Sequence, residues 1–155
     1  MKKISAIILA LCLFILSNCS SDDPVPVDET PEIYLKFFAN NQQFIFEPET
    51  FTSLQKLING YIFANDSITR VSLWMPVSPS VGTHQLQNVS ATTTNIDTLY
   101  SASFWLEDDV FVATTGSITI SDIDTDYIKG TFSFTGTSSD GATITISNGT
   151  FIAYN

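Results

Sequence analysis

Tyr127-Ile128-Lys129-Gly130-Thr131-Phe132-Ser133-Phe134-Thr135-Gly136 is the stretch of this 155-residue sequence that best indicates its fold. Every second residue from Ile128 to Phe134 is apolar or glycine, and the residues between them are lysine, threonine and serine. Successive side chains of a β-strand point to opposite faces of the sheet. The stretch therefore predicts an antiparallel strand with one face in a core and the other in water.

The residues that follow predict the partner of this strand. Asp140-Gly141 is typical of a tight turn, and residues 142–153 return as a second strand. In that strand Ile144 and Ile146 share a face, but Phe151 is one position out of phase. We predict a glycine bulge at Asn148-Gly149, which absorbs one residue and returns Phe151 to the core face. A two-residue Asn-Gly hairpin is the alternative, although few residues would remain to pair beyond it.

The chain upstream has the same character from residue 33 onward. Short runs rich in Phe, Tyr, Ile, Thr and Ser are divided by Gly, Asn, Asp and Pro, with hardly any sustained helical stripe. We therefore predict one all-β domain at 33–155, an antiparallel β-sandwich or flattened barrel. Segment 51–58 is compatible with a short helical turn or with another strand. The other expected strands are 34–38, 43–47, 61–64, 69–75, 83–86, 99–106 and 110–120.

The N-terminal segment has a different pattern. Lys2 and Lys3 precede an uncharged run at 4–16, which is shorter than the roughly 20 residues that span a bilayer. Residues 1–18 are therefore expected to be a secretory signal peptide, helical while attached. Residues 19–32 contain three prolines, five acidic residues and little apolar bulk, which predicts a disordered tether.

The junction Leu16-Ser17-Asn18-Cys19 resembles a bacterial lipoprotein signal, although Asn18 is larger than the residue usual before the cysteine. Cys12 is the poorer candidate, because cleavage there would leave the apolar 13–16 on the mature chain. The resemblance implies that Cys19 is the lipid anchor, carrying acyl chains such as palmitate that hold the protein on the membrane. Ser-Ser-Asp-Asp at 20–23 resembles the acidic export signal of Bacteroidota lipoproteins. That implies an outer-membrane protein facing the cell exterior.

Charge and cysteine content exclude several functions for the mature chain. The full sequence has a net charge of −10. Removing residues 1–18 takes away two lysines and no acidic residue, which leaves four basic against sixteen acidic residues. This balance argues against nucleic acid as a partner, since nucleic-acid binding needs clustered Lys and Arg. Cys12 would leave with the signal and Cys19 would carry lipid, so no disulfide or thiolate site is expected in the β domain.

Several phrases of the β domain together resemble a family of uncharacterised Bacteroidota lipoproteins. They occur in order over nearly the whole domain, and each alone is a generic strand phrase. The family implies no assigned activity and no catalytic residue. The phrases are Phe37-Phe38-Ala39-Asn40-Asn41-Gln42-Gln43-Phe44, Gly82-Thr83-His84-Gln85-Leu86, Gly116-Ser117-Ile118-Thr119-Ile120, Ile128-Lys129-Gly130-Thr131-Phe132-Ser133-Phe134 and Ile146-Ser147-Asn148-Gly149-Thr150-Phe151.

Asp122, Asp124 and Asp126 alternate as in the first half of a calcium-binding loop. The second half is missing, because position 6 is Tyr127 rather than glycine and position 12 is Ser133 rather than glutamate, which excludes an EF-hand. A simpler Ca²⁺ site, with help from Asp108 or Asp109, is one interpretation. A polar turn between two strands is the preferred one, and no cofactor is expected.

Trp74 and Trp105 are the candidates for a binding platform. Alternation places Trp74 on one strand face with Arg70 and Ser72, opposite the inward-facing Val71, Leu73 and Met75. It places Trp105 on one face with Leu99, Ser101 and Ser103. An exposed pair of tryptophans on one sheet would stack on sugar rings or anchor a protein partner. Tyr61, Tyr100 and Tyr154 are further aromatic candidates, most of which are expected in the core.

The sequence gives weaker indications of catalysis and of covalent modification than of a binding surface. Glu47, Glu49, Glu107 and Asp109 are the only plausible members of a glycosidase pair, and no pattern brings two of them together. His84, the only histidine, has no accompanying catalytic motif and is expected to be a half-exposed strand residue. Asp66-Ser67-Ile68 and Asp97-Thr98-Leu99 match the short signal for O-glycosylation of exported Bacteroidota proteins, at Ser67 and Thr98.

These observations favour a non-catalytic protein, lipid-anchored at the cell envelope, whose β domain binds a glycan or a protein. A structural or accessory subunit of an outer-membrane assembly is the second hypothesis. A hydrolase is the third.

Overall fold

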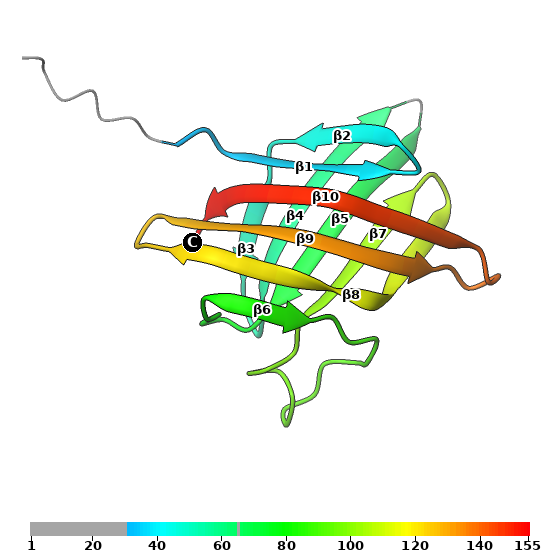
Figure 1. Ribbon diagram of the computed structural model, residues 1–155. Helices are drawn as coiled ribbons and strands as arrows, with labels where there is room; N and C mark the ends of the chain where they lie inside the picture. Colours follow the sequence, from blue (N-terminus) through cyan, green and yellow to red (C-terminus); the bar gives the residue numbers. More distant parts are fainter. Residues whose placement is uncertain (1–30, 65) are drawn as a thin grey trace, which may run out of the picture. The chain divides into compact units, whose positions relative to one another are not determined.

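The structure, a computed structural model, describes residues 31–64 and 66–155, in which ten β-strands and no helix occur (Figure 1). The predicted signal peptide, Cys19 and nearly all of the predicted tether lie outside these residues. No described residue belongs to a helix long and apolar enough to cross a membrane. The strands are β1 (Tyr34–Ala39), β2 (Gln42–Phe46), β3 (Glu49–Thr52), β4 (Lys56–Ala64), β5 (Ser67–Met75), β6 (Gly82–Gln85), β7 (Ser101–Leu106), β8 (Asp109–Ile123), β9 (Tyr127–Thr137) and β10 (Thr143–Tyr154).

All ten strands belong to one antiparallel sheet in the order β2-β1-β10-β9-β8-β7-β5-β4-β3, with β6 added on β8. The sheet curls so that β2, β1, β10, β9 and β8 form a front layer, and β7, β5, β4 and β3 cross behind it (Figure 1). The result is a half-barrel. The prediction of an all-β, antiparallel flattened barrel is confirmed.

Strand β8 connects the two layers. Its first residues pair with β7, from Leu106↔Asp109 to Ser103↔Val112, and its later residues pair with β6. The β8–β9 register shifts twice, after Ala113 and after Ile120. Gly116 lies between these shifts with φ of +132°, and a Cβ there would lie 2.2 Å from the carbonyl oxygen of Ser133. Irregularities of this kind bend a strand, which lets β8 leave one layer and join the other.

The C-terminal strands have the predicted alternation and the predicted bulge. Ile128, Gly130, Phe132 and Phe134 of β9 are all buried. The β9–β10 register shifts between Ile146 and Gly149, so that Phe151 is buried on the same face as Ile146. The glycine bulge is therefore confirmed, and the alternative Asn-Gly hairpin is wrong.

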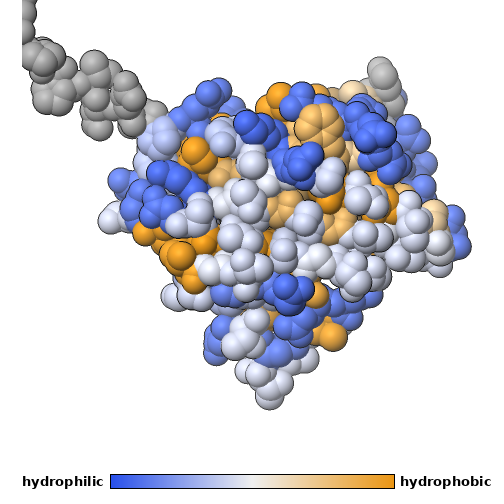
Figure 2. Space-filling model, in the orientation of Figure 1, coloured by the Kyte–Doolittle hydropathy of each residue, from blue (hydrophilic) through white to orange (hydrophobic). Residues whose placement is uncertain are grey.

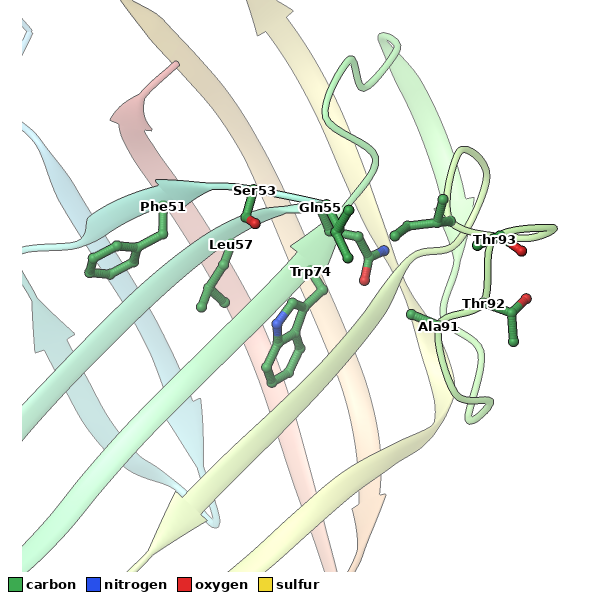
Figure 3. A pocket seen from close by; sticks show the side chains of 10 residues that line it. Phe51, Ser53, Gln55, Leu57, Trp74, Ala91, Thr92 and Thr93 are labelled. Atoms are coloured by element: carbon green, nitrogen blue, oxygen red, sulfur yellow. The ribbon is translucent and has the colours of Figure 1, made fainter.

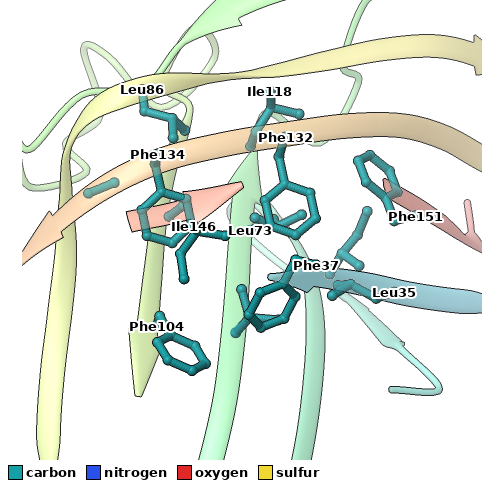
Figure 4. Packing of buried hydrophobic residues seen from close by; sticks show 14 of the residues in the cluster. Leu35, Phe37, Leu73, Leu86, Phe104, Ile118, Phe132, Phe134, Ile146 and Phe151 are labelled. Atoms are coloured by element: carbon teal, nitrogen blue, oxygen red, sulfur yellow. The ribbon is translucent and has the colours of Figure 1, made fainter. Parts of the chain in front are cut away.

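Phenylalanine rings fill the space between the layers (Figure 4). Phe37 of β1 has its ring centroid 5.4 Å from that of Phe104 on β7 and 5.9 Å from that of Phe132 on β9. Leu73 of β5 and Phe151 of β10 are also fully buried. One continuous core thus joins both halves of the curled sheet.

The end of the chain connects β3 and β4 to β10. Thr50 Oγ1 donates a hydrogen bond to the carbonyl oxygen of Tyr154 at 2.8 Å. Lys56 Nζ donates to Asn155 Oδ1, and the Asn155 backbone N–H donates to the carbonyl oxygen of Asp126 at 2.9 Å. Lys56 is buried, and the loss of hydration lowers the pKa of its ammonium group.

Some predicted boundaries were wrong. Segment 51–58 contains no helical turn, because it forms the end of β3 and the start of β4, which pair from Glu49↔Asn59 to Thr52↔Lys56. Strand β7 begins at Ser101 rather than at Leu99, and Leu99 is buried instead of sharing the face of Trp105. The start of β4 carries few of the β-branched and aromatic residues that signal a strand, and pairing with β5 determines it.

Candidate functional site

The outer faces of the two layers differ in chemistry. On the front layer, hydroxyl side chains alternate with the buried residues of β8, β9 and β10, and the surface in Figure 2 is mostly pale or blue there. These hydroxyl residues include Ser117, Thr119, Thr131, Ser133, Thr145 and Ser147. The aromatic candidates Trp74, Trp105 and Tyr61 lie on the outer face of the other layer. That face is the candidate site.

A groove of about 560 Å³ lies at one end of this face (Figure 3). Its floor is a row of cross-strand neighbours, in which Phe51 of β3 pairs with Leu57 of β4 and Leu57 pairs with Trp74 of β5. Trp74 and Leu57 are half-buried, and Phe51 is exposed. Ala91, Thr92, Thr93 and Ile96, from the connection between β6 and β7, form its other side. We call this site the Trp74 groove.

Hydrogen bonds hold the wall of the groove in place. Asn95 Oδ1 accepts the Thr92 backbone N–H at 2.7 Å, and Asn95 Nδ2 donates to the carbonyl oxygen of Ser90 at 3.1 Å. Gln55 Nε2, from the turn between β3 and β4, donates to the carbonyl oxygen of Leu99 at 3.1 Å. The groove is therefore built by bonded segments on both sides, as in binding sites that are largely pre-formed.

The chemistry of the Trp74 groove is apolar with neutral polar groups at its edge. None of the ten residues that line it carries a charge, although the whole sequence is strongly acidic. Ser53, Gln55, Thr92 and Thr93 supply hydroxyl and amide groups to the lining of the groove. Such a lining suits a neutral ligand that has both apolar surface and hydroxyl groups.

Polar residues follow the groove along the strands. Ser72 of β5 pairs with Asn59 of β4 and with Ser103 of β7, and all three residues are buried. Ser72 Oγ donates a hydrogen bond to Asn59 Oδ1 at 2.8 Å. This bond satisfies two polar side chains that have little access to water.

A second aromatic row lies beyond these residues. Arg70 of β5 pairs with Tyr61 of β4 on one side and with Trp105 of β7 on the other. The Arg70 Cζ atom lies 4.5 Å from the centroid of the Trp105 ring. The Tyr61 hydroxyl donates to Glu49 Oε1 at 3.2 Å, and this bond, together with the charge of Glu49, raises the pKa of Tyr61. We call Tyr61, Arg70 and Trp105 the arginine row.

The two predicted platform residues share the outer face but are not neighbours. Trp74 pairs with Ser101, and Trp105 pairs with Arg70, so the two tryptophans lie four positions apart along the strands. Each ring is half-buried rather than fully exposed. The structure thus has two separate aromatic positions, about 13 Å apart along the strands at the usual rise per residue. Tyr100 is buried as expected, whereas Tyr61 and Tyr154 are exposed.

The three aspartates of the possible Ca²⁺ site have different surroundings. Asp122 Oδ2 lies 3.5 Å from Lys129 Nζ. Asp124 Oδ1 accepts the backbone N–H groups of Asp126 and Tyr127 at 2.8 and 2.7 Å, and these bonds lower the pKa of Asp124. Within 31–64 and 66–155, no three His, Cys, Asp or Glu side chains are grouped so that they could hold a metal ion.

The candidate acids of a glycosidase lie in two separate turns. Glu47 and Glu49 flank Pro48, with Glu49 at the start of β3, and Glu107 and Asp109 lie at the turn between β7 and β8, with Asp109 at the start of β8.

His84 is half-buried in β6, as predicted, and its ring stacks on Tyr100 with the centroids 4.0 Å apart. Ser67 begins β5 beside Asp66, and Thr98 is exposed near the end of the β6–β7 connection. The Thr98 hydroxyl donates to the carbonyl oxygen of Asn95 at 3.2 Å.

Sequence reasoning missed most of the Trp74 groove. Phe51 lay in the ambiguous segment, and residues 91–96 gave no strand or helix signal. One feature of the sequence could have indicated the position of Phe51. This residue stands between Thr50 and Thr52, and such alternation is compatible with an outward-facing aromatic residue on a strand. Arg70 was placed on the correct face, but its contact with Trp105 depends on the register between β5 and β7.

Comparison with known proteins identifies a family but no named relative. Neither a curated protein nor a solved structure matches the chain. One family model, described as "Domain of unknown function (DUF6252)", matches residues 37–154. The match runs from within β1 to the end of β10 and includes both the Trp74 groove and the arginine row. The chain therefore belongs to the DUF6252 family.

Proposed function

We propose that this protein is a Bacteroidota lipoprotein, anchored at the outer face of the outer membrane through Cys19, whose β domain binds a glycan without catalysis. The observation that carries the binding proposal is the Trp74 groove, with an aromatic and aliphatic floor and a rim of uncharged hydroxyl and amide groups.

The lining of the groove favours a sugar over a protein segment. One face of a pyranose ring presents C–H groups, which pack on the electron-rich face of an indole ring, and its edge presents hydroxyl groups. The Trp74 groove offers both kinds of group, because Gln55, Thr92 and Thr93 line it together with the indole ring. Protein interfaces are instead commonly centred on deeply buried aromatic and arginine anchors.

The anchor proposal depends on sequence features alone. Cys19 directly follows an apolar run with a basic start and precedes Ser-Ser-Asp-Asp. Two or more acyl chains hold a protein on a membrane for long periods, because each buried CH₂ contributes about 0.8 kcal/mol. Display on a membrane surface is compatible with capture of an extracellular glycan.

A glycan-array screen of the full-length chain in mild detergent tests the binding proposal. We expect binding to at least one neutral oligosaccharide class, and we expect Trp74→Ala to weaken it by roughly tenfold or more. Phe63→Ala is the matched control, since Phe63 is an exposed aromatic residue of β4 outside the groove. If Trp74→Ala binds as tightly as Phe63→Ala, the groove is not the binding site.

Metabolic labelling with a palmitate analogue in a bacterial host tests the anchor. We expect the label on the wild-type chain and on Cys12→Ser, and no label on Cys19→Ser. Labelling that survives Cys19→Ser would refute the assignment of the anchor. Protease treatment of intact cells then distinguishes an outward-facing protein from one that faces the periplasm.

An accessory subunit of an outer-membrane assembly is the second candidate function. Exposed apolar side chains on β2 and β4 favour it, since Ile45, Ile62 and Phe63 are 65, 53 and 70% exposed. Ile62 and Phe63 are consecutive residues of one strand and point to opposite faces of the sheet, so each is a separate candidate contact for a partner. Recovery of a stoichiometric membrane partner in a pull-down, lost in Ile62→Ser but kept in Trp74→Ala, would favour the assembly over glycan binding.

A further inference from the structure

The arginine row contains a positive charge, whereas no residue that lines the Trp74 groove is charged. Arg70 is the only arginine of the chain, and its side chain is half-buried on the outer face. The three lysines of the described residues lie on other elements and have contacts of their own. Lys129 pairs with Asp122, Lys56 with Asn155, and Lys36 lies 4.7 Å from the centroid of the Tyr34 ring.

Arg70 has no carboxylate partner within the described part of the chain. Lys129 and Asp122 form the only ion pair found in residues 31–64 and 66–155. The buried Arg70 Nε has no hydrogen-bond acceptor among these residues either, and the same is true of Trp105 Nε1. Most buried polar atoms of proteins are hydrogen-bonded, and two of the three buried side-chain atoms without a partner in the described residues lie in the arginine row.

Stacking on Trp105 determines how this cation is held. A guanidinium group over an indole face gains electrostatic stabilisation from the ring, and its two terminal Nη groups, unlike the buried Nε, are the donors that a ligand would reach. The aromatic neighbours Tyr61 and Trp105 occupy the two adjacent strands, so no acidic residue lies directly beside Arg70 in the sheet. A planar fork of donors matches a carboxylate, whose two oxygens accept parallel hydrogen bonds.

The remaining charge of the protein limits what kind of anion would bind. The strongly negative chain repels a densely charged polyanion at long range. A glycan with neutral units and an occasional acidic unit avoids most of this repulsion. The arginine row lies about 13 Å from Trp74 along the strands, which is the reach of a short oligosaccharide.

We propose that Arg70, held on Trp105 beside Tyr61, binds the carboxylate of a uronic acid unit in a glycan whose neutral units occupy the Trp74 groove. This inference rests on the proposed glycan-binding function and names its ligand class. A sulfate ester offers a related group of anionic oxygens, and the test therefore includes it as a separate arm.

The experiment uses the full-length chain in mild detergent and a panel of uronate-bearing oligosaccharides. Each is paired with its carboxyl-reduced counterpart, which has the same sugars without the charge, and with a sulfated neutral oligosaccharide. We expect at least one pair in which the uronate form binds roughly tenfold or more tightly than the reduced form. Added salt should weaken binding of the uronate form and leave the reduced form nearly unchanged.

Variants then assign the preference to Arg70. Arg70→Gln should lower the affinity for the uronate form to that of the reduced form, and Arg70→Lys should restore part of it, since lysine keeps the charge but not the fork. Lys36→Gln is the matched control, because it removes the same charge from the other layer and should keep the preference. Thermal melting of each variant establishes that it is folded.

The outcomes separate this inference from the proposed function. Equal binding of both members of every pair, or a preference that survives Arg70→Gln, would overturn the role of Arg70. A preference for the sulfated form alone would overturn the assignment of a uronate. In each of these cases, binding of a neutral oligosaccharide that is lost in Trp74→Ala would still support the proposed glycan-binding function. Binding to no glycan would overturn both proposals.

Discussion

Replacement of Phe37 by alanine is expected to be among the most destabilising single changes in the β domain. The Phe37 side chain is 1% exposed and joins the two layers of the curled sheet. Its ring centroid lies 5.3 Å from that of Phe44, 5.4 Å from Phe104, 5.9 Å from Phe132 and 6.0 Å from Phe46. Truncation would therefore remove four aromatic contacts and leave a cavity between the layers.

The magnitude follows from the burial and the partners. Phe→Ala changes in protein cores typically cost about 3–5 kcal/mol, and the cost rises with the size of the cavity that remains. The rings around Phe37 come from strands on both layers, which the rest of the sheet holds apart. Little collapse is possible there, so we expect a loss near about 4 kcal/mol in the free energy of unfolding.

Urea unfolding measured by tryptophan fluorescence and by far-ultraviolet circular dichroism tests this expectation. The dependence of the unfolding free energy on urea should stay the same while the midpoint falls. Phe63→Ala is the matched control, since Phe63 is 70% exposed and its ring contact in the described residues is with Tyr61, with centroids 5.6 Å apart. It should lose about 1 kcal/mol or less. Equal losses in the two variants, or a loss below about 1.5 kcal/mol in Phe37→Ala, would refute the packing argument.

Three further predictions concern the bulge and two titrating groups. Gly149→Ala should destabilise the protein by roughly 1–3 kcal/mol in urea unfolding, because a Cβ there would lie 2.5 Å from the carbonyl oxygen of Phe132; wild-type stability would contradict this. Backbone hydrogen bonds lower the pKa of Asp124 in the folded protein. The ionised Asp124 carboxylate therefore stabilises the fold above the ordinary pKa of an aspartate, and this stabilisation is lost as the pH falls through the lowered pKa of the folded state. Carboxyl titration followed by NMR should therefore find Asp124 ionised below the usual range, and an ordinary midpoint would argue against these bonds. Burial lowers the pKa of Lys56 in the folded protein. At pH values between this lowered pKa and the ordinary pKa of a lysine, Lys56 is protonated in the unfolded chain and neutral in the folded chain. Stability should rise with pH through this window in the wild type but not in Lys56→Met, as measured by urea midpoints, and identical pH profiles would exclude Lys56 as the source.

Local patterns were sufficient to predict much of the fold. The alternation in 127–136 predicted which residues of β9 are buried, and the phase error at Phe151 predicted the bulge at Asn148-Gly149. Both predictions depend on which way neighbouring side chains of a single strand point, and that is a property of the local backbone. The segment 51–58 was ambiguous because its strand pairing is not encoded in a strong local preference.

The candidate site was predictable only in part. Alternation placed Trp74, Arg70 and Trp105 on outward-facing positions of their strands. It could not show that Arg70 lies against Trp105 while Trp74 lies four residues away, since that depends on the register between β5 and β7. The wall of the Trp74 groove comes from a connection without regular structure, which periodicity does not describe.

The all-β character, the side of the sheet to which most strand residues point, the acidic charge and the lack of thiols within 31–155 could be read from the amino-acid sequence. Which outward-pointing residues become neighbours depends on the folded sheet. Phe51, Leu57 and Trp74 form one floor, and Tyr61, Arg70 and Trp105 form one row, because β3, β4, β5 and β7 pair in that order and register. The physical reason is that a side chain's facing depends on its own strand, whereas its partners depend on long-range hydrogen bonding and on the curl of the whole sheet.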